Sequence, residues 1–159
     1  MAGETIAQVE DAIIAALKPL DYLRALETYQ GQLTEATLDE IVTRLAVNFP
    51  AALVLYLGSR LEESPTYLYG DVQTWGVYVA AKNLRGEKEA RRGGAAAVGT
   101  YEMIEGVKKQ LTGNALGLSI QPLSLKAIDS ILVEDGLSVY GLTFETLLDY
   151  EATAKAGPV

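Results

Sequence analysis

Residues 127–147 read AIDSILVEDGLSVYGLTFETL, in which Asp135-Gly136 separates two runs rich in apolar and β-branched residues. A two-residue type I′ turn needs positive φ at both central positions, and Asp-Gly is one of the few pairs that accept this backbone. The stretch therefore predicts an antiparallel hairpin. Counting back from the turn pairs Val133 with Ser138 and Ile131 with Tyr140. In this register one face carries the residues expected in the core: Ile131, Val133, Tyr140, Leu142 and Phe144.

Three further strands are predicted upstream of this hairpin. Residues 51–61, AALVLYLGSRL, hold an apolar run with no polar face and indicate a strand that is covered on both sides and central in the sheet. Residues 72–83, VQTWGVYVAAKN, indicate a second strand that pairs with the first across the turn-rich segment 62–70. Residues 23–29, LRALETY, indicate a short strand, and residues 116–125, LGLSIQPLSL, are expected to run extended into the final hairpin.

Helical spacing of apolar residues predicts three helices. The first begins after Thr5, which forms a capping box with Gln8, and ends near Pro19. The second begins at Thr34 or Thr37 and ends by Phe49, because Pro50 follows. The third covers residues 94–111. Its apolar stripe consists of Ala97, Tyr101, Ile104, Val107 and Leu111.

Together these elements predict an α/β (α+β) fold in the order α-β-α-β-β-α-β-β, with a mixed or largely antiparallel sheet flanked by helices. A chain of 159 residues, 49% of them hydrophobic, is most simply one domain with a core of its own. We expect this domain to span residues 1–150. Residues 151–159, EATAKAGPV, are small and aperiodic, and we expect a flexible tail there.

The composition limits the chemistry that this chain can perform. A net charge of −8 argues against a protein that coats nucleic acid, because such binding depends on basic residues. Cysteine and histidine are both absent from the sequence, which excludes Ser-His-Asp and Cys-His catalysis and most zinc sites. The missing cysteine also fits a reducing cytoplasm. The acidic N-terminal segment does not resemble a signal peptide, and no apolar run approaches the roughly 20 residues of a membrane span.

The stretch KNLRGEKEARRGG, residues 82–94, concentrates positive charge in this acidic chain. Its glycines do not have the spacing of a P-loop or of a dinucleotide fingerprint. We interpret it as a strand-to-helix turn followed by a basic first helical turn. Arg91 and Arg92 would then oppose the helix dipole, so we expect them, with Arg85, to serve a contact with another subunit or partner.

No residue type in the sequence is assigned a catalytic role. The carboxylate pairs Glu62-Glu63 and Glu134-Asp135 fall in turns, where solvated surface is the expected role, and Ser59 lacks both a nucleophile elbow and a histidine. We therefore predict no enzyme activity, no cofactor and no metal. Tyr67 and Tyr69 lie in the segment 62–70, and exposed tyrosines there would suit a protein contact.

The order of several segments resembles the tail terminator, or tail completion, proteins of Mu-like phages and prophages. The segments are VEDAIIAALKPLDYLRALETYQGQL (9–33), VYVAAKNLRGEKEARRGG (77–94), GTYEMIEGVKKQLTGNALGLSIQPL (99–123) and GLSVYGLTFET (136–146). The resemblance spans most of the chain and rests on order and spacing, with no catalytic signature. The segment 62–70 matches least well.

This resemblance implies an α/β fold that assembles as a ring, a hexamer, on the head-proximal end of a completed tail tube. Such a ring ends polymerisation of the tube and sheath and presents a surface to head-completion and neck proteins. The implied partners are further copies of the chain, the tail tube protein and the sheath of a contractile tail, with DNA only passing through the lumen. The implied location is the virion tail or neck, after assembly in the host cytoplasm, with no membrane involved.

Two other functions fit the same residues. The first is another neck or head-tail connector protein, since both are small acidic ring-formers. The second and more remote is a small enzyme that uses lysine or carboxylates, for example a nucleotide hydrolase. The second would be expected to carry a phosphate loop, and the sequence has none.

Overall fold

The structure, a computed structural model, describes residues 4–29, 40, 49–63, 68–83, 87–93, 98–134 and 136–151. Within these ranges the elements follow the chain in an order that begins with a helix and ends with a hairpin. They are α1 (Ile6–Leu17), β1 (Ala25–Thr28), β2 (Ala51–Glu63), β3 (Leu68–Lys82), α3 (Glu87–Arg92), α4 (Thr100–Leu111), β4 (Ser124–Glu134) and β5 (Leu137–Glu151). The predicted second helix and the predicted tail beyond Glu151 lie outside the described residues.

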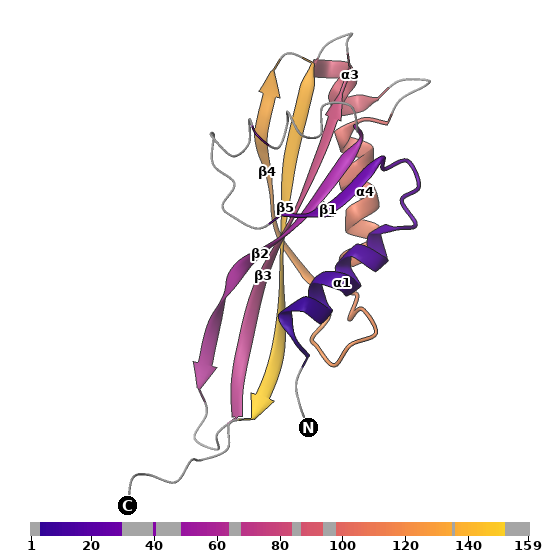
Figure 1. The fold of residues 1–159 in the computed structure, drawn as a ribbon. Helices are drawn as coiled ribbons and strands as arrows, with labels where there is room; N and C mark the ends of the chain where they lie inside the picture. Colours follow the sequence, from indigo (N-terminus) through magenta and orange to yellow (C-terminus); the bar gives the residue numbers. More distant parts are fainter. Residues whose placement is uncertain are drawn as a thin grey trace, which may run out of the picture.

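The strands form one five-stranded sheet in the order β1-β2-β3-β5-β4 (Figure 1). β1 is parallel to β2, and the other three pairs are antiparallel. This is the mixed α+β architecture that the sequence predicts, with the β2–β3 and β4–β5 pairs in place. Pro122 lies just before β4 begins at Ser124, as expected for a residue that donates no backbone hydrogen bond.

The final hairpin has the predicted register close to its turn and departs from it further away. Val133 lies opposite Ser138, but Tyr140 faces Ser130 because the register shifts between Ser130 and Leu132. Ile131 occupies this bulge and is 37% exposed. The prediction that Ile131 faces the core opposite Tyr140 is therefore wrong, since one extra residue in a strand turns the following side chains to the other face.

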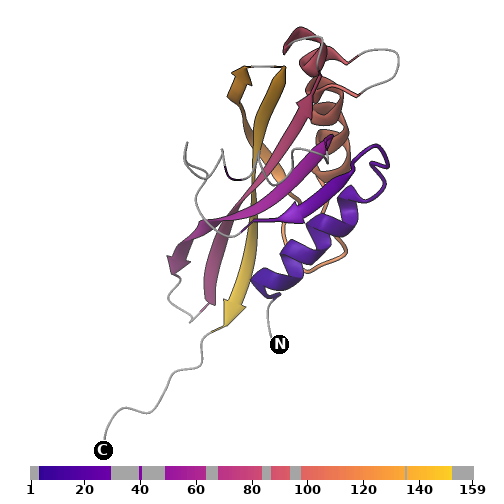
Figure 2. The same cartoon turned by 45° about the horizontal axis from the view of Figure 1, so that its top comes forward.

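The main core lies between the sheet and the helices α1 and α4, which run along the same side of it (Figure 2). Helix α1 begins with the predicted capping box: the Thr5 amide donates to Gln8 Oε1 (2.7 Å), and the Gln8 amide donates to Thr5 Oγ1 (3.1 Å). Its buried residues are Val9, Ile13 and Leu17. They pack with a cluster that includes the largest fully buried side chains, Trp75 and Phe144.

Only the first part of β2 is buried on both faces. Ala51 to Leu55 are all buried, with Ala52 and Val54 in the main core and Leu53 and Leu55 in a second cluster on the opposite face. After Tyr56 the strand becomes exposed. The sequence thus predicts the covered strand correctly for its first half, while β3 lies at the centre of the sheet.

The third predicted helix is shorter than its apolar pattern suggested. Helix α4 begins at Thr100, after Gly99, instead of at residue 94. A side chain on Gly99 would lie 2.3 Å from the Gly93 nitrogen, so this junction packs backbone against backbone. Thr100 and Met103 are buried, whereas Tyr101 is 45% exposed, so Tyr101 is not part of the core stripe. Residues 94–97, including Ala97, lie outside the described residues.

Replacement of Gly136 by alanine should destabilise the fold more than the same change at Gly117. Both glycines have positive φ (76° and 70°), which costs alanine about 1–2 kcal/mol. At Gly136 the new Cβ would also lie 2.4 Å from the Asn83 carbonyl oxygen, whereas nothing lies within 4 Å at Gly117. We expect Gly136→Ala to lower the free energy of unfolding by at least about 1 kcal/mol more than Gly117→Ala. Urea unfolding measures both, and equal losses would contradict the close packing of Gly136 on Asn83.

Candidate assembly surfaces

Three strands extend beyond the rest of the sheet and form a distal arm, defined here as residues 57–63 of β2, 68–74 of β3 and 146–151 of β5 (Figure 1). β1 pairs only with Ala51 to Val54, and β4 pairs with β5 only as far as Glu145. In the arm, therefore, the sheet narrows to three strands. The far end of the arm extends beyond helices α1 and α4 (Figure 1).

The distal arm is held together by polar side chains on the face that continues the main core. Trp75 Nε1 donates a hydrogen bond to Gln73 Oε1 (3.0 Å), and Gln73 Nε2 donates to Asp71 Oδ2 (3.0 Å). Gln73 is 1% exposed. On β5, Thr146 Oγ1 donates to the Gln121 carbonyl, and the Gln121 amide donates to the Leu147 carbonyl. The arm is thus tied to the core and to the segment before β4.

The outer edge of the arm is the second half of β2. Among the described residues, no strand pairs with the side of Gly58–Glu63 that faces away from β3. Leu57 and Leu61 are 42% and 61% exposed along it. Arg60 forms a solvent-exposed ion pair with Glu62 (3.7 Å). Exposed strand edges with apolar side chains are typical of sites where a second strand adds.

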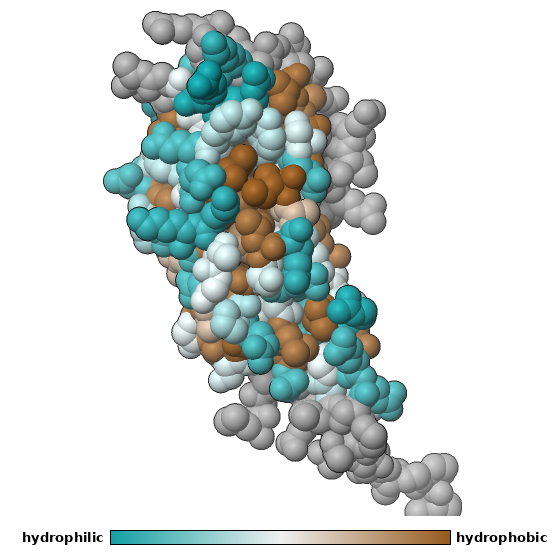
Figure 3. Space-filling view, turned by 180° about the vertical axis from the view of Figure 1, so that it is seen from behind, coloured by the Kyte–Doolittle hydropathy of each residue, from teal (hydrophilic) through white to brown (hydrophobic). Residues whose placement is uncertain are grey.

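The opposite edge of the sheet is formed by β4, which pairs only with β5 among the described strands. It carries two of the other exposed large apolar residues, Ile128 (41%) and Ile131 (37%). Its register shifts around Lys126 and Ile131. Seen from behind in Figure 3, the molecule shows apolar residues gathered in the middle of one face with hydrophilic residues around them.

Charge is distributed unequally between the two ends of the molecule. The distal arm contains five acidic residues and one basic residue, whereas residues 82–93 contain five basic and two acidic residues. Figure 1 places α3, within that basic segment, at the opposite end from the arm. We call residues 82, 83 and 87–93, the described part of this segment, the basic end.

The two arginines of the basic end stand at the end of a helix and not at its start. Arg91 and Arg92 form the last turn of α3, and Gly93, with φ of 78°, follows. Positive charge stabilises a helix C-terminus, so the predicted conflict with the helix dipole is wrong. Ala90 is buried and anchors the helix, while Arg92 and Lys88 are exposed.

A tyrosine pair lies beside the basic end. The rings of Tyr101 and Tyr140 meet edge to face with centroids 5.9 Å apart. Burial raises the pKa of Tyr140, and its hydrogen bond with Tyr101 acts in the same direction, whereas the Ser130 hydrogen bond and the Arg91 charge oppose the rise. The charge of Arg91 thus reaches the Tyr101–Tyr140 pair.

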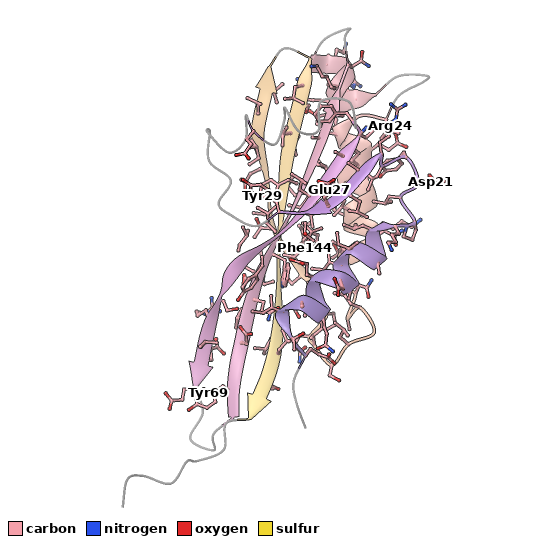
Figure 4. All side chains as sticks on the ribbon, in the orientation of Figure 1. Asp21, Arg24, Glu27, Tyr29, Tyr69 and Phe144 are labelled. Carbon is pink, nitrogen blue, oxygen red and sulfur yellow. The ribbon has the colours of Figure 1, made fainter. Side chains whose placement is uncertain are left out.

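The structure does not bring the sequence-predicted contact residues together. Arg85 and Tyr67 lie outside the described residues. Tyr69 is partly buried and lies at the tip of the arm, far from Arg91 and Arg92 at the basic end (Figure 4). The predicted contacts therefore belong to two opposite ends of the molecule. The apolar edge residues Leu57, Leu61 and Ile128 were not singled out by sequence, because alternation alone does not show where a neighbouring strand ends.

A pocket of about 340 Å³ opens beside the basic end. Its lining residues come from the segments before β1 and β2 and from the end of β3: Tyr22, Arg24, Phe49, Pro50, Ala81, Lys82 and Val98. The Tyr22 hydroxyl is buried against Gly106 and has no hydrogen-bond partner among the described residues. Burial raises the pKa of Tyr22, and Glu102 and Asp21 raise it further. Both carboxylates would oppose an anion near this hydroxyl.

The described residues contain no group of three or more acidic side chains placed to hold a metal ion. None of the helices within these ranges is both long enough and apolar enough to cross a membrane. The surfaces described above are two sheet edges, an acidic arm and a basic end.

A fold similar to this one also occurs in a solved virion. A chain from the structure titled "Virion of native gene transfer agent (GTA) particle" is similar with a TM-score of 0.54 and 14% sequence identity, over 89% of this chain and 95% of that chain. At this identity the similarity concerns the fold. A search of curated proteins found no match.

The family model described as "Bacteriophage Mu, Gp37" matches residues 5–148. The match covers all the described elements except the last residues of β5. The chain belongs to this phage protein family, which confirms its resemblance to a protein of Mu-like phages.

Replacement of Tyr22 by phenylalanine should not weaken the fold at neutral pH. The buried hydroxyl has no hydrogen-bond partner in the described part of the chain, so its removal should raise the free energy of unfolding by about 1 kcal/mol. Because the pKa of Tyr22 is raised in the folded state, the unfolded chain loses this proton first as the pH rises, and folding stability falls above about pH 10. The variant should lose less stability than wild type between pH 8 and pH 10.5, roughly spanning the tyrosine titration. Urea unfolding at both values measures this, and a clear loss at neutral pH would show that the hydroxyl has a partner.

Proposed function

We propose that this chain is a structural phage tail protein that forms an oligomeric ring, a hexamer, on the head-proximal end of the tail tube. The ring ends polymerisation of the tube and of a contractile sheath and prepares the tail for joining to the head. Membership of the Mu Gp37 family and the fold shared with a virion chain support a phage structural role. The protein then belongs to the tail or neck of the virion and meets its partners in the host cytoplasm.

The observation that carries the proposal is that the sheet has two different free edges on its opposite sides. The distal half of β2 and the whole of β4 have no outer neighbour among the described strands, and both carry exposed apolar residues. A contact between two different surfaces of the same protein is heterologous, and repeated heterologous contacts form a ring when the rotation between neighbours closes. A self-complementary patch would instead favour a dimer.

The two ends of the molecule then supply the two faces of the ring. The basic end and the acidic arm lie at opposite ends of the strands. A ring whose axis is inclined to the strands therefore exposes one of these ends on the face toward the tube and the other on the face toward the head. Charge of opposite sign on the two faces favours a single orientation on the tube. We infer that Arg91, Arg92 and, beyond the described residues, Arg85 contact a partner at one face, and Tyr69 and Tyr67 at the other.

The acidic balance of the chain also suits a ring through which DNA passes. A net charge of −8 per subunit repels the DNA backbone, and this repulsion acts over about 8–10 Å at physiological salt. DNA in a lumen of this kind would slide through without binding. The protein is expected to bind DNA weakly at any salt concentration.

The pure protein should stop the growth of tail tubes. When the tail tube protein polymerises with this chain present, we expect short tubes with a ring at one end in negative-stain images. A head-tail connector would instead bind the portal side of the head and leave tube length unchanged. Tubes that grow to the same length with and without the chain would contradict the terminator function, and portal binding would support the connector.

The double substitution Arg91→Glu/Arg92→Glu should leave the oligomer intact and weaken its attachment to one neighbour. These arginines lie on the basic end and not on a sheet edge, so their reversal changes a face of the ring. Lys18→Glu/Lys109→Glu is the control, because it makes the same change in net charge at exposed sites elsewhere. Co-sedimentation with tubes and with heads measures attachment. Loss of the oligomer would instead make the arginines a subunit contact.

A further inference from the structure

We propose that neighbouring subunits join their sheets edge to edge, with residues 57–63 of β2 in one copy pairing antiparallel with residues 126–132 of β4 in the next, and Leu61 opposite Ile128. This inference rests on the proposed ring and specifies its subunit contact. It assigns a function to the free edge of the distal arm and to the free edge of β4. The occupant of each edge is a second copy of this chain.

The strand directions meet the requirement of a ring. β2 is antiparallel to β3, β3 to β5, and β5 to β4, so β4 runs opposite to β2 within one subunit. Two copies placed side by side in the same orientation therefore bring β2 of one and β4 of the other together as an antiparallel pair. Antiparallel pairs can form between separate chains without a crossover connection. The same sheet face also remains on the same side in every copy.

The two edges match residue by residue when Leu61 is set opposite Ile128. Both side chains lie on the helix-covered face, because Leu61 aligns across β3 with Leu148 and Ile128 pairs with Leu142, both core residues. They are 61% and 41% exposed in the single subunit. Direct cross-strand pairs of apolar residues are a main source of stability between strands. Pairing would bury both.

The same register brings two pairs of opposite charges together, one of them on the face opposite the helices. Arg60 falls opposite Asp129, and Glu63 falls opposite Lys126. Arg60 pairs with Val72 and Asp129 with Gly141, which places both on the face opposite the helices. Within the described residues Arg60 forms an exposed ion pair with Glu62, and such pairs contribute little to stability. Like charges would face each other at neither position.

The irregular positions of the two edges also coincide. The register of β2 shifts between Tyr56 and Gly58, and that of β4 shifts between Ser130 and Leu132. In the proposed pairing Ile131 falls opposite Gly58, and Leu132 falls opposite Leu57. Bulges increase the local twist of a strand, so two bulges at the same level let both edges bend together. The pairing ends there, before it would reach β1 beside Val54.

The pairing fixes how neighbouring subunits are staggered. In one subunit Ile128 is aligned through Leu142 and Val77 with Val54, whereas in the proposed contact it meets Leu61. Measured along β3, from Val77 to Asp71, the next copy is therefore displaced by six residues, roughly 20 Å at 3.3 Å per residue. A constant stagger of this kind tilts the strands relative to the ring axis, as strands are tilted in closed barrels. Closure into a ring needs such a tilt.

A second copy of the chain fits these edges better than another protein, because the two complementary edges, residues 57–63 and 126–132, both belong to this chain. The described residues include six exposed large apolar side chains, and four of them lie on the two edges: Leu57, Leu61, Ile128 and Ile131. A partner that bound one edge only would leave the other pair exposed. A ring covers all four in every subunit.

Cysteine cross-linking tests this contact directly, because the chain contains no cysteine. The variant Leu61→Cys/Ile128→Cys is purified, oxidised and separated without reducing agent. The two positions lie three strand spacings apart within a subunit, about 14 Å, which is too far for an internal disulfide. We expect a ladder of covalent oligomers that ends at the number of subunits in the ring. If the free protein is monomeric, the same oxidation is performed on rings bound to tail tubes.

The controls establish the register and the direction of the contact. Leu61→Cys/Ser130→Cys moves one cysteine two residues along the same face of β4 and should form few cross-links, because diagonal neighbours lie about 7–8 Å apart. A mixture of the single variants Leu61→Cys and Ile128→Cys should give only dimers. Dimers from Leu61→Cys alone would show a two-fold contact between β2 edges and would overturn the proposal. Rings that form without the ladder would overturn this contact while leaving the proposed function in place.

A charge exchange gives an independent measurement. Arg60→Glu places two acidic groups opposite each other and should weaken oligomer association about two- to fivefold per contact, and Asp129→Lys should do the same. Combining both substitutions should restore the wild-type association measured by light scattering at several concentrations. A double variant that is weaker than either single variant would contradict the pairing of these residues.

Discussion

The pairing of β3 with β5 is the interaction on which the rest of the structure depends. It runs without interruption from Leu68 opposite Glu151 to Lys82 opposite Leu137, fifteen residues on each strand. Strands of this length extend about 46 Å, whereas the 12-residue helices α1 and α4 are each about 18 Å long. The two helices therefore cover only part of the sheet, and the remainder projects as the distal arm. The free edge of the arm also requires that β1 ends at Thr28, whereas β4 is exposed because it is the last strand of the sheet.

The change from helix-covered sheet to arm is visible along β3 itself. Val77 and Val79 lie in the apolar core, Trp75 closes it, and Gln73 and Asp71 follow as a hydrogen-bonded polar pair. The buried Gln73 amide thus donates one hydrogen bond and accepts another within β3 itself, without a partner from the helices. The side chains thus keep one register of β3 through a region where apolar packing ends. This rigidity lets the arm present its edge in a defined orientation.

Local patterns in the sequence predicted much of the fold. The antiparallel pairing of β4 with β5, the Thr5–Gln8 capping box and the pairing of β2 with β3 each depend on residues close together in the chain, and the structure contains all three. The bulge at Ile131 and the start of α4 after Gly99 depend on distant contacts, among them the packing of Gly99 on residues 91–93. For this reason the sequence placed Ile131 and Tyr101 in the core, where the structure leaves both exposed.

The candidate assembly surfaces were harder to predict for the same reason. Leu61 reads as one more apolar residue of a strand, and it is exposed only because β1 ends at Thr28 and leaves the second half of β2 without a neighbour. The composition of residues 82–94 identified them as a basic stretch. That Arg91 and Arg92 lie at the end of a helix and not at its start depends on where α3 begins and ends. Charged residues can be identified from the sequence alone, whereas an unpaired strand edge depends on how all the strands of the sheet are arranged.

Free edges with exposed apolar residues are hazardous for a protein that waits for its partner. A regular edge accepts any extended chain, which is the usual route to aggregation. Here both edges are interrupted, β2 at Leu57 and β4 at Lys126 and Ile131, and both carry charges between their apolar residues. An arbitrary strand would meet a bulge or an unmatched charge at several positions. The bulges and charges thus make each edge a poor partner for an arbitrary strand. A strand with a bulge near the same level and opposite charges in the same order can pair without an unmatched charge, so the pairing is selective.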